Sequence, residues 1–169
     1  VDVCGDRPVG INVLRNDARS ALAIAVAAGA RLVRVNVHSG AAVTDQGLVE
    51  GRAADTLRLR DALGASPGAT GEIAIVADVH VKHARPLAQD ETIEQAAKDA
   101  AERGLADGLI VSGAATGDAP DPDLARRVRA ACPGVPLLLG SGLTPRNAAA
   151  LAPHLDGAIA ASAAREQGK

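Results

Sequence analysis

The stretch IAIVADVHVKH (residues 73–83) decides the fold that we predict, because it begins as a buried strand and ends in ionisable side chains. Its first four residues are apolar and mostly β-branched, a pattern typical of a strand covered on both faces. Side chains alternate along a strand, so Asp78, His80 and Lys82 share one side if the extended conformation continues. Parallel α/β proteins bind ligands where their strands end, so this stretch is the centre of the predicted site.

Five further segments are predicted to be strands of the same kind, and Ala-rich stretches with helix signals separate most of them. Residues 44–63 are less regular, and we expect a loop followed by a helix from about Gly51. The strand segments are residues 9–14, 32–38, 108–113, 135–142 and 157–162. The helix signals are Asp17 with an end at Gly29, Asp90 with an end at Gly104, Asp121 with Pro122, and Thr144 with Pro145.

Strands that alternate regularly with helices indicate a parallel sheet, either open or closed into a barrel. A doubly wound sheet would carry a glycine-rich fingerprint after its first strand, and none is present. Nearly every strand instead ends in polar or glycine residues, which favours a ring of strands that meet at one mouth. We therefore predict a TIM (β/α)8-type barrel.

The number of strands is short of a complete barrel, because eight βα units usually need about 250 residues and this chain has 169. We expect residues 1–169 to form a single (β/α)-barrel domain that lacks the first two strands and the last helix. On this interpretation the chain is a C-terminal portion of a longer protein.

Composition excludes several classes of function. The formal charge of −2 gives no electrostatic reason to expect nucleic acid as a partner, and without Phe, Tyr or Trp no aromatic platform can stack bases. The longest apolar run, residues 21–30, is about half of a membrane span. Cys4 and Cys132 match no metal spacing and are interpreted as unpaired thiols. A cytoplasmic protein is expected.

Asp78 and Lys82 are the candidate catalytic residues, because burial can bring either pKa toward neutrality and so permit proton transfer. The alternative is an ion pair between them that orders the loop before Pro86. A Schiff-base role for Lys82 is less favoured. We predict no metal site, although His38, Asp78, His80 and His83 are potential ligands, because no metal-binding word supports one.

Polar residues at other strand ends are candidates for substrate binding. Arg34, Asn36 and His38 alternate with valines in the segment 32–38, and we expect Asn36 and His38 to contact a ligand. For Arg34 an ion pair with a neighbouring carboxylate is at least as well supported. Asn12 and Asp45 complete the predicted substrate-binding set.

Phosphate is predicted to bind at Gly140, Ser141 and Gly142, together with Ser162 after the last strand. Glycines let backbone N–H groups approach an anion closely. In many barrels the loops after the last two strands bind a phosphate group. The alternative is a tight turn followed by a capped helix.

Several short sequence motifs together resemble those of the BtpA family. They are NVLRND (12–17), VTDQG (43–47), ADVHVKHARPL (77–87), ADGLIVSGAATG (106–117) and GSGLTPRN (140–147). The family includes a photosystem I biogenesis factor and SgcQ-type proteins linked to sugar catabolism. The resemblance implies a TIM barrel related to the phosphate-binding barrels, with a preceding region that holds the first two strands. It also implies a cytoplasmic location, peripheral to the thylakoid membrane in photosynthetic members.

The chain departs from that family pattern near its end. Ala161 and Ser162 stand where members tend to have Gly-Thr, Arg165 replaces a lysine, and the aromatic near Leu32 is absent. A methyl group at Ala161 would crowd a backbone N–H away from a phosphate, which weakens the predicted anion site on that side.

We therefore predict an enzyme that binds a small phosphorylated, sugar-phosphate-like compound, with the reaction and any cofactor unknown. The alternatives are a non-catalytic photosystem I biogenesis or assembly factor and a truncated chain that has lost its function. The expected partner is the small ligand, with no nucleic acid and no membrane span, and homo-oligomerisation stays open.

Overall fold

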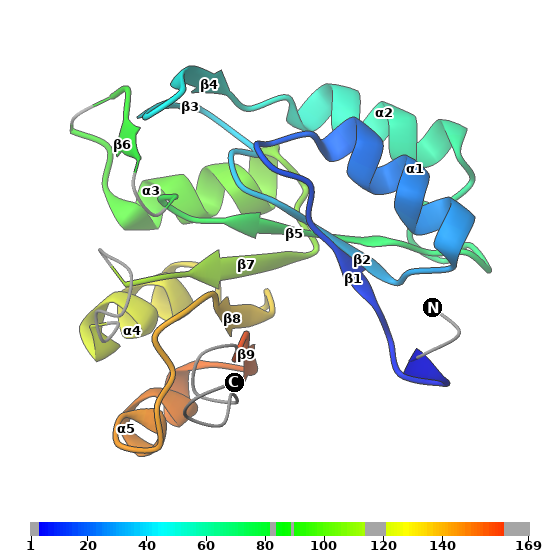
Figure 1. Cartoon of the computed structure of the whole chain (residues 1–169). Helices are drawn as coiled ribbons and strands as arrows, with labels where there is room; N and C mark the ends of the chain where they lie inside the picture. The colour runs from blue at the N-terminus through cyan, green and yellow to red at the C-terminus, as the bar shows by residue number, and fades with distance from the viewer. Residues whose placement is uncertain (1–3, 82–83, 89, 114–120, 161–169) are drawn as a thin grey trace.

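The six predicted strands form one parallel sheet in which each strand lies beside the next one along the chain (Figure 1). The computed structural model describes residues 4–81, 84–88, 90–113 and 121–160. A doubly wound sheet reverses its strand order at a switch point, whereas this sheet keeps one direction and curls. The predicted barrel architecture is confirmed as a half-barrel. Its strands are β1 (Gly10–Ile11), β2 (Leu32–Val35), β5 (Ala74–Asp78), β7 (Gly108–Val111), β8 (Leu137–Leu139) and β9 (Gly157–Ala158).

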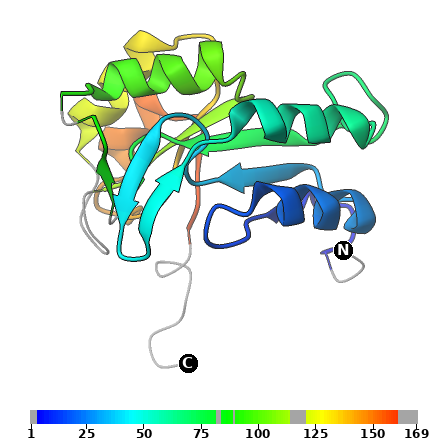
Figure 2. The same ribbon diagram turned by 90° about the horizontal axis from the view of Figure 1, so that it is seen from above.

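The helices cover one face of this sheet, with α1 and α2 packed side by side (Figures 1 and 2). The predicted ends of α1 are confirmed: the Asp17 carboxylate accepts from Ser20 N, and Gly29 takes the left-handed conformation at φ 66°. Asp121 caps α4 with Pro122 in its first turn, also as predicted. The helices are α1 (Ala18–Ala28), α2 (Ala53–Ala62), α3 (Ile93–Lys98), which continues as a π-helix (Asp99–Arg103), α4 (Pro122–Ala131) and α5 (Ala148–Leu151), followed by a 3₁₀ turn (Ala152–His154).

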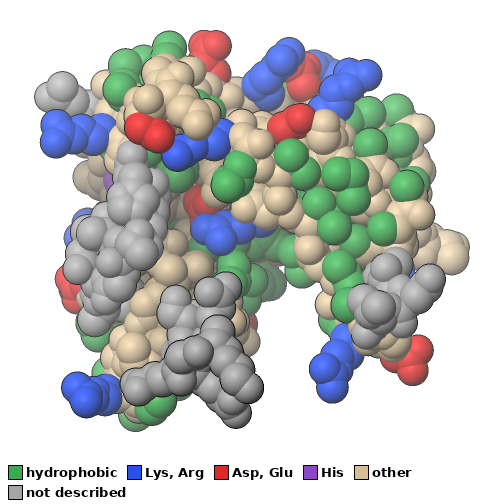
Figure 3. Space-filling model, viewed as in Figure 1, with side chains coloured by type: hydrophobic (Ala, Val, Ile, Leu, Met, Phe, Trp, Pro, Cys, Tyr) green, Lys and Arg blue, Asp and Glu red, His purple; other side chains and the backbone are tan. Residues whose placement is uncertain are grey.

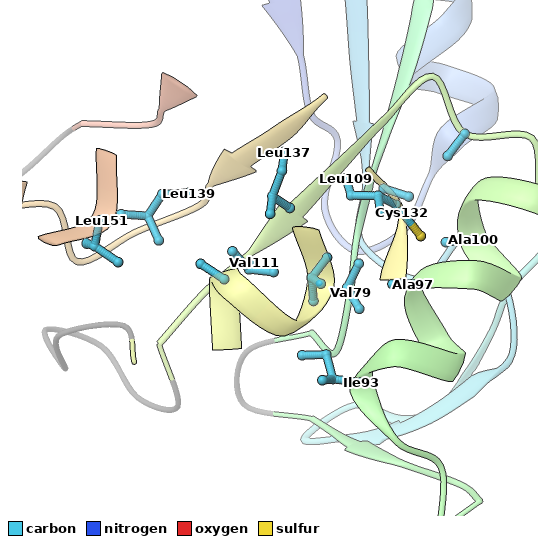
Figure 4. Packing of buried hydrophobic residues seen from close by; sticks show 14 residues of the cluster. Val79, Ile93, Ala97, Ala100, Leu109, Val111, Cys132, Leu137, Leu139 and Leu151 are labelled. Carbon is cyan, nitrogen blue, oxygen red and sulfur yellow. The ribbon is translucent and has the colours of Figure 1, made fainter. Parts of the chain in front are cut away.

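Two apolar clusters separate the sheet from its helices. One joins β1, β2 and β5 to α1, with Leu22, Val33 and Ile75 fully buried. The other joins β5, β7 and β8 to α3 and α4, and Figure 4 shows Leu109 and Leu137 of this cluster with Ala97 of α3. Alternation along each strand therefore sends one set of side chains to the helices and the other set to the concave face of the half-barrel.

Residues 41–50 form an antiparallel hairpin, so the predicted loop over this part of the chain is wrong. Its strands β3 (Ala41–Thr44) and β4 (Gly47–Glu50) join β6 (Arg85–Pro86) in a small second sheet, which stands apart from the main one (Figure 2). Gly47 permits the turn because it adopts φ 97°, a conformation that strains other residues. The predicted helix from about Gly51 follows as α2.

Two other helix starts differ from their predictions. Thr92, not Asp90, caps α3 by accepting from Gln95 N. The predicted start at Thr144 is wrong, because Thr144 and Asn147 exchange side chain–backbone hydrogen bonds in a turn and the short α5 begins only at Ala148.

The same aspartate–arginine contact recurs at the amino ends of two strands. Asp107 accepts from the backbone N–H of Ile75 at 2.7 Å and pairs with the buried Arg60 of α2. Asp156 accepts from the backbone N–H of Leu137 at 2.7 Å and pairs with Arg129 of α4. Each contact ties a helix to two neighbouring strands at the end of the sheet opposite the candidate site.

Within the described ranges, none of the helices has both the length and the apolar character that crossing a bilayer requires.

Candidate functional site

Asp78 ends β5 on the concave face, where Arg34 of β2 holds its carboxylate. Arg34 Nε and Nη2 lie between 2.9 and 3.2 Å from the two carboxylate oxygens, in a bidentate arrangement. Asn36 Nδ2 donates to Oδ2 of Asp78 at 2.6 Å. The side chain of Asp78 is 4% exposed and that of Arg34 is 22% exposed. Arg34 therefore forms an ion pair with a neighbouring carboxylate, which was one of the two roles considered for it.

Burial raises the pKa of the Asp78 carboxyl above its ordinary value. The Arg34 charge and the hydrogen bonds from Arg34 and Asn36 act in the opposite direction but offset only part of this effect. A carboxyl group whose pKa is displaced toward neutrality exchanges its proton more readily near neutral pH, as a general acid or base must.

Asn12 follows β1 and brings a third strand end to the same place. Its Nδ2 donates to the backbone carbonyl of Arg34 at 3.0 Å and lies 3.3 Å from Oδ1 of Asn36. Asn12, Asn36 and Asp78 were all predicted as site residues, and the structure brings them into one hydrogen-bonded chain across β1, β2 and β5.

A cavity of about 190 Å³ lies next to these hydrogen-bonded side chains. The segment after β1 and the hairpin form its walls, and Asp78 and Arg34 lie at its base. Its lining consists of Leu14, Arg15, Asn16, Arg34, Asn36, Val37, Thr44, Val49, Asp78 and Val81. Figure 3 shows the face of the molecule that is hollowed between the part containing β1 and the part containing β9.

Asp45 joins the two walls of this cavity rather than lining it. It lies at the tip of the hairpin, and its carboxylate pairs with Arg15 at 2.8 Å. Since the Asp45 side chain is 62% exposed, this is a surface ion pair, weakened by solvent, that links the hairpin to the segment after β1.

Sequence reasoning missed Arg15 and Asn16 as site residues, although both belong to the word NVLRND. Asn16 adopts the left-handed conformation at φ 62°, which asparagine tolerates better than most residues. Its side chain accepts from Val37 N at 2.7 Å and donates to Val37 O at 2.8 Å. The run of polar residues after the first strand was the available signal.

Gly140 directly follows β8 and lies beside Arg34. A methyl group there would come within 3.2 Å of Arg34 Nη2, within 2.6 Å of Ile110 Cγ2, and closer still to the Ser112 hydroxyl. The Gly140 N–H donates to Val111 O within the sheet. Gly140 therefore supplies space for the Arg34–Asp78 pair, and its own N–H is already used.

The rest of the predicted phosphate loop forms a turn at the same end of the sheet. Gly142 has φ 84°, and its carbonyl accepts from Asn147 Nδ2 at 2.8 Å. Ser141 lies between the two glycines. Ser162 and Lys82, predicted for phosphate binding and catalysis, fall outside the described residues, as does His83.

His38 lies away from the cavity, so the structure does not bring it to the predicted ligand contact. It is 1% exposed, and its Nε2 donates to the Gly104 carbonyl at 2.8 Å. The reason is that β2 ends at Val35, so the alternation assumed for residues 32–38 does not continue to position 38. Burial lowers the pKa of the His38 imidazole. In the described part of the chain, no three His, Cys, Asp or Glu residues gather as a metal site would require.

The curled sheet of βα units and its polar strand ends define a protein of the TIM-barrel class with a candidate small-molecule site. A solved structure described as "Native KDPGal structure" shares this fold, with a TM-score of 0.55 and 17% identity over 100% of this chain and 64% of that one. The sequence model of the BtpA family matches residues 5–169, and the chain belongs to that family.

Several relatives support this assignment. The Photosystem I biogenesis protein BtpA of Synechocystis is 48% identical over 95% of this chain and 54% of its own length. An uncharacterized protein of Pyrococcus furiosus is 44% identical over 96% of this chain and 58% of its own length. An uncharacterized mitochondrial protein of Caenorhabditis elegans is 36% identical over 82% of this chain and 48% of its own. The chain thus spans about half the length of these curated relatives.

Proposed function

We propose that this BtpA-family chain binds a small phosphorylated compound at the mouth of its half-barrel and transfers a proton to or from it through Asp78. The observation that supports this most is the buried Asp78 carboxylate, which Arg34 and Asn36 hold against the base of a cavity. A buried ionisable group with a displaced pKa at the end of a barrel strand is typical of a catalytic site.

An anionic ligand fits the charge of this mouth. Arg34 uses Nε and Nη2 for Asp78, so Nη1 takes no part in that pair. Protonation of Asp78, which burial favours, would leave the Arg34 charge unbalanced and attractive to a phosphate. The loop around Ser141 and Gly142 lies at the same end of the sheet, because β8 and β2 both end there.

The size of the cavity limits the ligand. A cavity of about 190 Å³ is smaller than the range of about 300–1,000 Å³ that is typical of ligand pockets, which favours a small compound over a dinucleotide. Lys82 and Ser162 stay predictions from the sequence as the second proton-transfer residue and the second phosphate contact.

The experiment is a thermal-shift screen with phosphorylated sugars, the same sugars without phosphate, and inorganic phosphate. Binding to the folded state must stabilise it, by about 2.7 kcal/mol at a ligand concentration of 100 Kd. For a domain of this size that corresponds to a rise in Tm of about 5–10 °C. We expect such a rise with at least one phosphorylated sugar and none with its unphosphorylated counterpart.

The matched variants are Asp78→Asn at the site and Asp156→Asn at the opposite end of the sheet, each an aspartate paired with an arginine. Asp156→Asn should keep the ligand-induced rise, whereas Asp78→Asn should change it. A screen without any shift, or equal shifts in both variants, would contradict the proposed site.

A second candidate function is an assembly role without turnover. It is favoured by the printed name of the 48% identical Synechocystis relative, a photosystem I biogenesis protein. Proton transfer requires an ionisable group at position 78, whereas docking to an assembly partner does not. If this chain supports photosystem I content in a photosynthetic host deprived of its own BtpA, and Asp78→Asn supports it equally well, the assembly role is favoured over the enzyme.

A further inference from the structure

His80 lies two residues after Asp78, and its backbone has a conformation that is unusual for a residue other than glycine. It is a non-glycine residue at φ 54°, in the left-handed region that β-carbon sterics disfavour. Its Nε2 is buried and, among the described residues, has no hydrogen-bond partner. Strained residues persist where the surrounding structure holds them, and they concentrate at functional sites.

His80 faces a charged group, Glu91, in the segment before α3. Glu91 Oε2 lies 3.4 Å from His80 Nε2, an ion-pair distance without hydrogen-bond geometry. The side chain of His80 is 30% exposed and that of Glu91 is 24% exposed, so this pair reaches solvent. The side chain of Asp78, at 4%, is much less exposed than either.

A second, smaller cavity connects this pair with Asp78. Its volume is about 40 Å³, and the hairpin residues Ala41 and Ala42 belong to its lining. The polar side chains of the lining are those of Asn36, Ser39, Asp78, His80 and Glu91. A polar cavity of this size holds a water molecule when two or more polar partners surround it. A single water there would have the carboxyl of Asp78 and the imidazole of His80 among the polar groups of its surroundings.

We propose that His80, oriented by Glu91, is the residue through which Asp78 exchanges its proton with solvent. The inference rests on the proposed function, because a relay is needed only if Asp78 transfers protons. It explains why a polar atom of a strained residue is left without a partner in a cavity that Asp78 also lines.

The proton balance of the relay is simple. The Asp78 carboxylate takes a proton from the bound compound, and the bonding electron pair stays on the compound. Asp78 then gives this proton to the water in the small cavity, and the same water gives one of its protons to Nε2 of the neutral His80 ring. The imidazolium passes the proton on Nε2 to the Glu91 carboxylate, which lies 3.4 Å away and is 24% exposed. Glu91 releases this proton to solvent, and the ring is neutral again with Nε2 able to accept. In the reverse direction the same groups supply a proton.

The test is hydrogen exchange between bound compounds and D2O, followed by proton NMR, with a panel of triose, pentose and hexose phosphates. The variant is His80→Asn, because asparagine accepts the left-handed conformation but has no imidazole. We expect Asp78→Asn to abolish exchange and His80→Asn to slow it by about tenfold or more. His80→Gly should be slow as well and should regain exchange when free imidazole is added.

Leu105→Asn is the matched control, because Leu105 is also left-handed, at φ 51°, but precedes β7 at the other end of the sheet. It should exchange at the wild-type rate. Exchange at the wild-type rate in His80→Asn, with loss in Asp78→Asn, would overturn the relay and leave the proposed function standing. Exchange that survives Asp78→Asn, or no exchange with any member of the panel, would overturn both.

Discussion

At the scale of single residues, the Arg34–Asp78 pair explains why several neighbours are what they are. Arg34 reaches Asp78 across the concave face, and Gly140 after β8 leaves the room that the guanidinium needs. Asn36 and Asn12 extend the pair to β1 by hydrogen bonds. The site therefore depends on residues in or directly after four strands: β1, β2, β5 and β8. The residue after β8, Gly140, contributes space because it has no side chain.

Gly140→Ala tests that dependence. The added methyl group collides with Ile110 and Ser112 and displaces Arg34, so we expect a loss of about 1–3 kcal/mol of unfolding free energy together with a smaller ligand-induced rise in Tm. Gly134→Ala is the control, because a β-carbon there meets nothing within 4 Å. Urea denaturation of both variants is the measurement. Equal stability of the two would contradict the close packing at Gly140.

His38 predicts a pH dependence of stability. Its pKa is lowered in the folded protein, so below the ordinary value of about 6.5 the unfolded chain binds a proton that the folded protein does not. Stability should therefore fall as the pH falls below about 6.5, by at most about 1.4 kcal/mol per pH unit. Urea denaturation of the wild type and of His38→Gln between pH 7.5 and 5.5 measures this. If the unfolding free energy of both proteins fell equally with pH, His38 would not be the cause of the pH dependence.

The positions of Asp78, Asn36 and Asn12 could be predicted from the sequence because the carboxyl ends of parallel strands share one edge. The position of His38 could not, since it depends on where β2 stops, and nothing in the alternation of residues 32–38 marks that point. Arg34 was ambiguous because the same side chain serves an ion pair or a ligand equally well.

At the scale of elements, the strands and the capped helices are local features that the sequence predicts well. Asp17 and Asp121 accept from backbone N–H groups within the first turn of their helices, and the Gly29 N–H donates to carbonyls of the last turn of α1. The hairpin was missed because its pairing with β6 joins residues far apart in the chain, and because two glycines suggested an irregular loop. The alternation in residues 41–50 around a glycine turn was the available signal.

Asp121→Ala tests the cap of α4. Loss of the side-chain acceptor for Asp123 N should cost about 1 kcal/mol of unfolding free energy. Asp123→Ala removes only a solvent-exposed pair with Arg126 in the same turn and should cost a few tenths of that. Chemical denaturation measures both variants. A larger loss in Asp123→Ala than in Asp121→Ala would show that the cap has been misidentified.

At the scale of the whole molecule, β5 belongs to both apolar clusters. Ile75 packs in the cluster of α1, while Ala77 and Val79, further along the same chain segment, pack in the cluster of α3 and α4. The strand that ends in Asp78 therefore joins the two halves of the core, and it is one of the two central strands of the sheet.

Leu109→Ala tests the larger cluster. Leu109 of β7 is 1% exposed and packs in the cluster with α3 and α4, so its truncation should cost about 2–5 kcal/mol of unfolding free energy. Leu48→Ala, on the exposed face of the hairpin at 56%, should change stability by no more than about 0.5 kcal/mol. Urea denaturation distinguishes the two, and a similar cost at both positions would contradict the packing of the cluster.

The central claim is that the strand ends of β1, β2, β5 and β8 form one ligand site, and NMR mapping of amide chemical shifts tests it most directly. A phosphorylated sugar that raises Tm should be titrated into the labelled protein. We predict shift changes concentrated at Asn12, Asn36, Asp78 and Gly142. Changes confined to the outer helices α1, α2 and α4, with these four amides unmoved, would contradict the account.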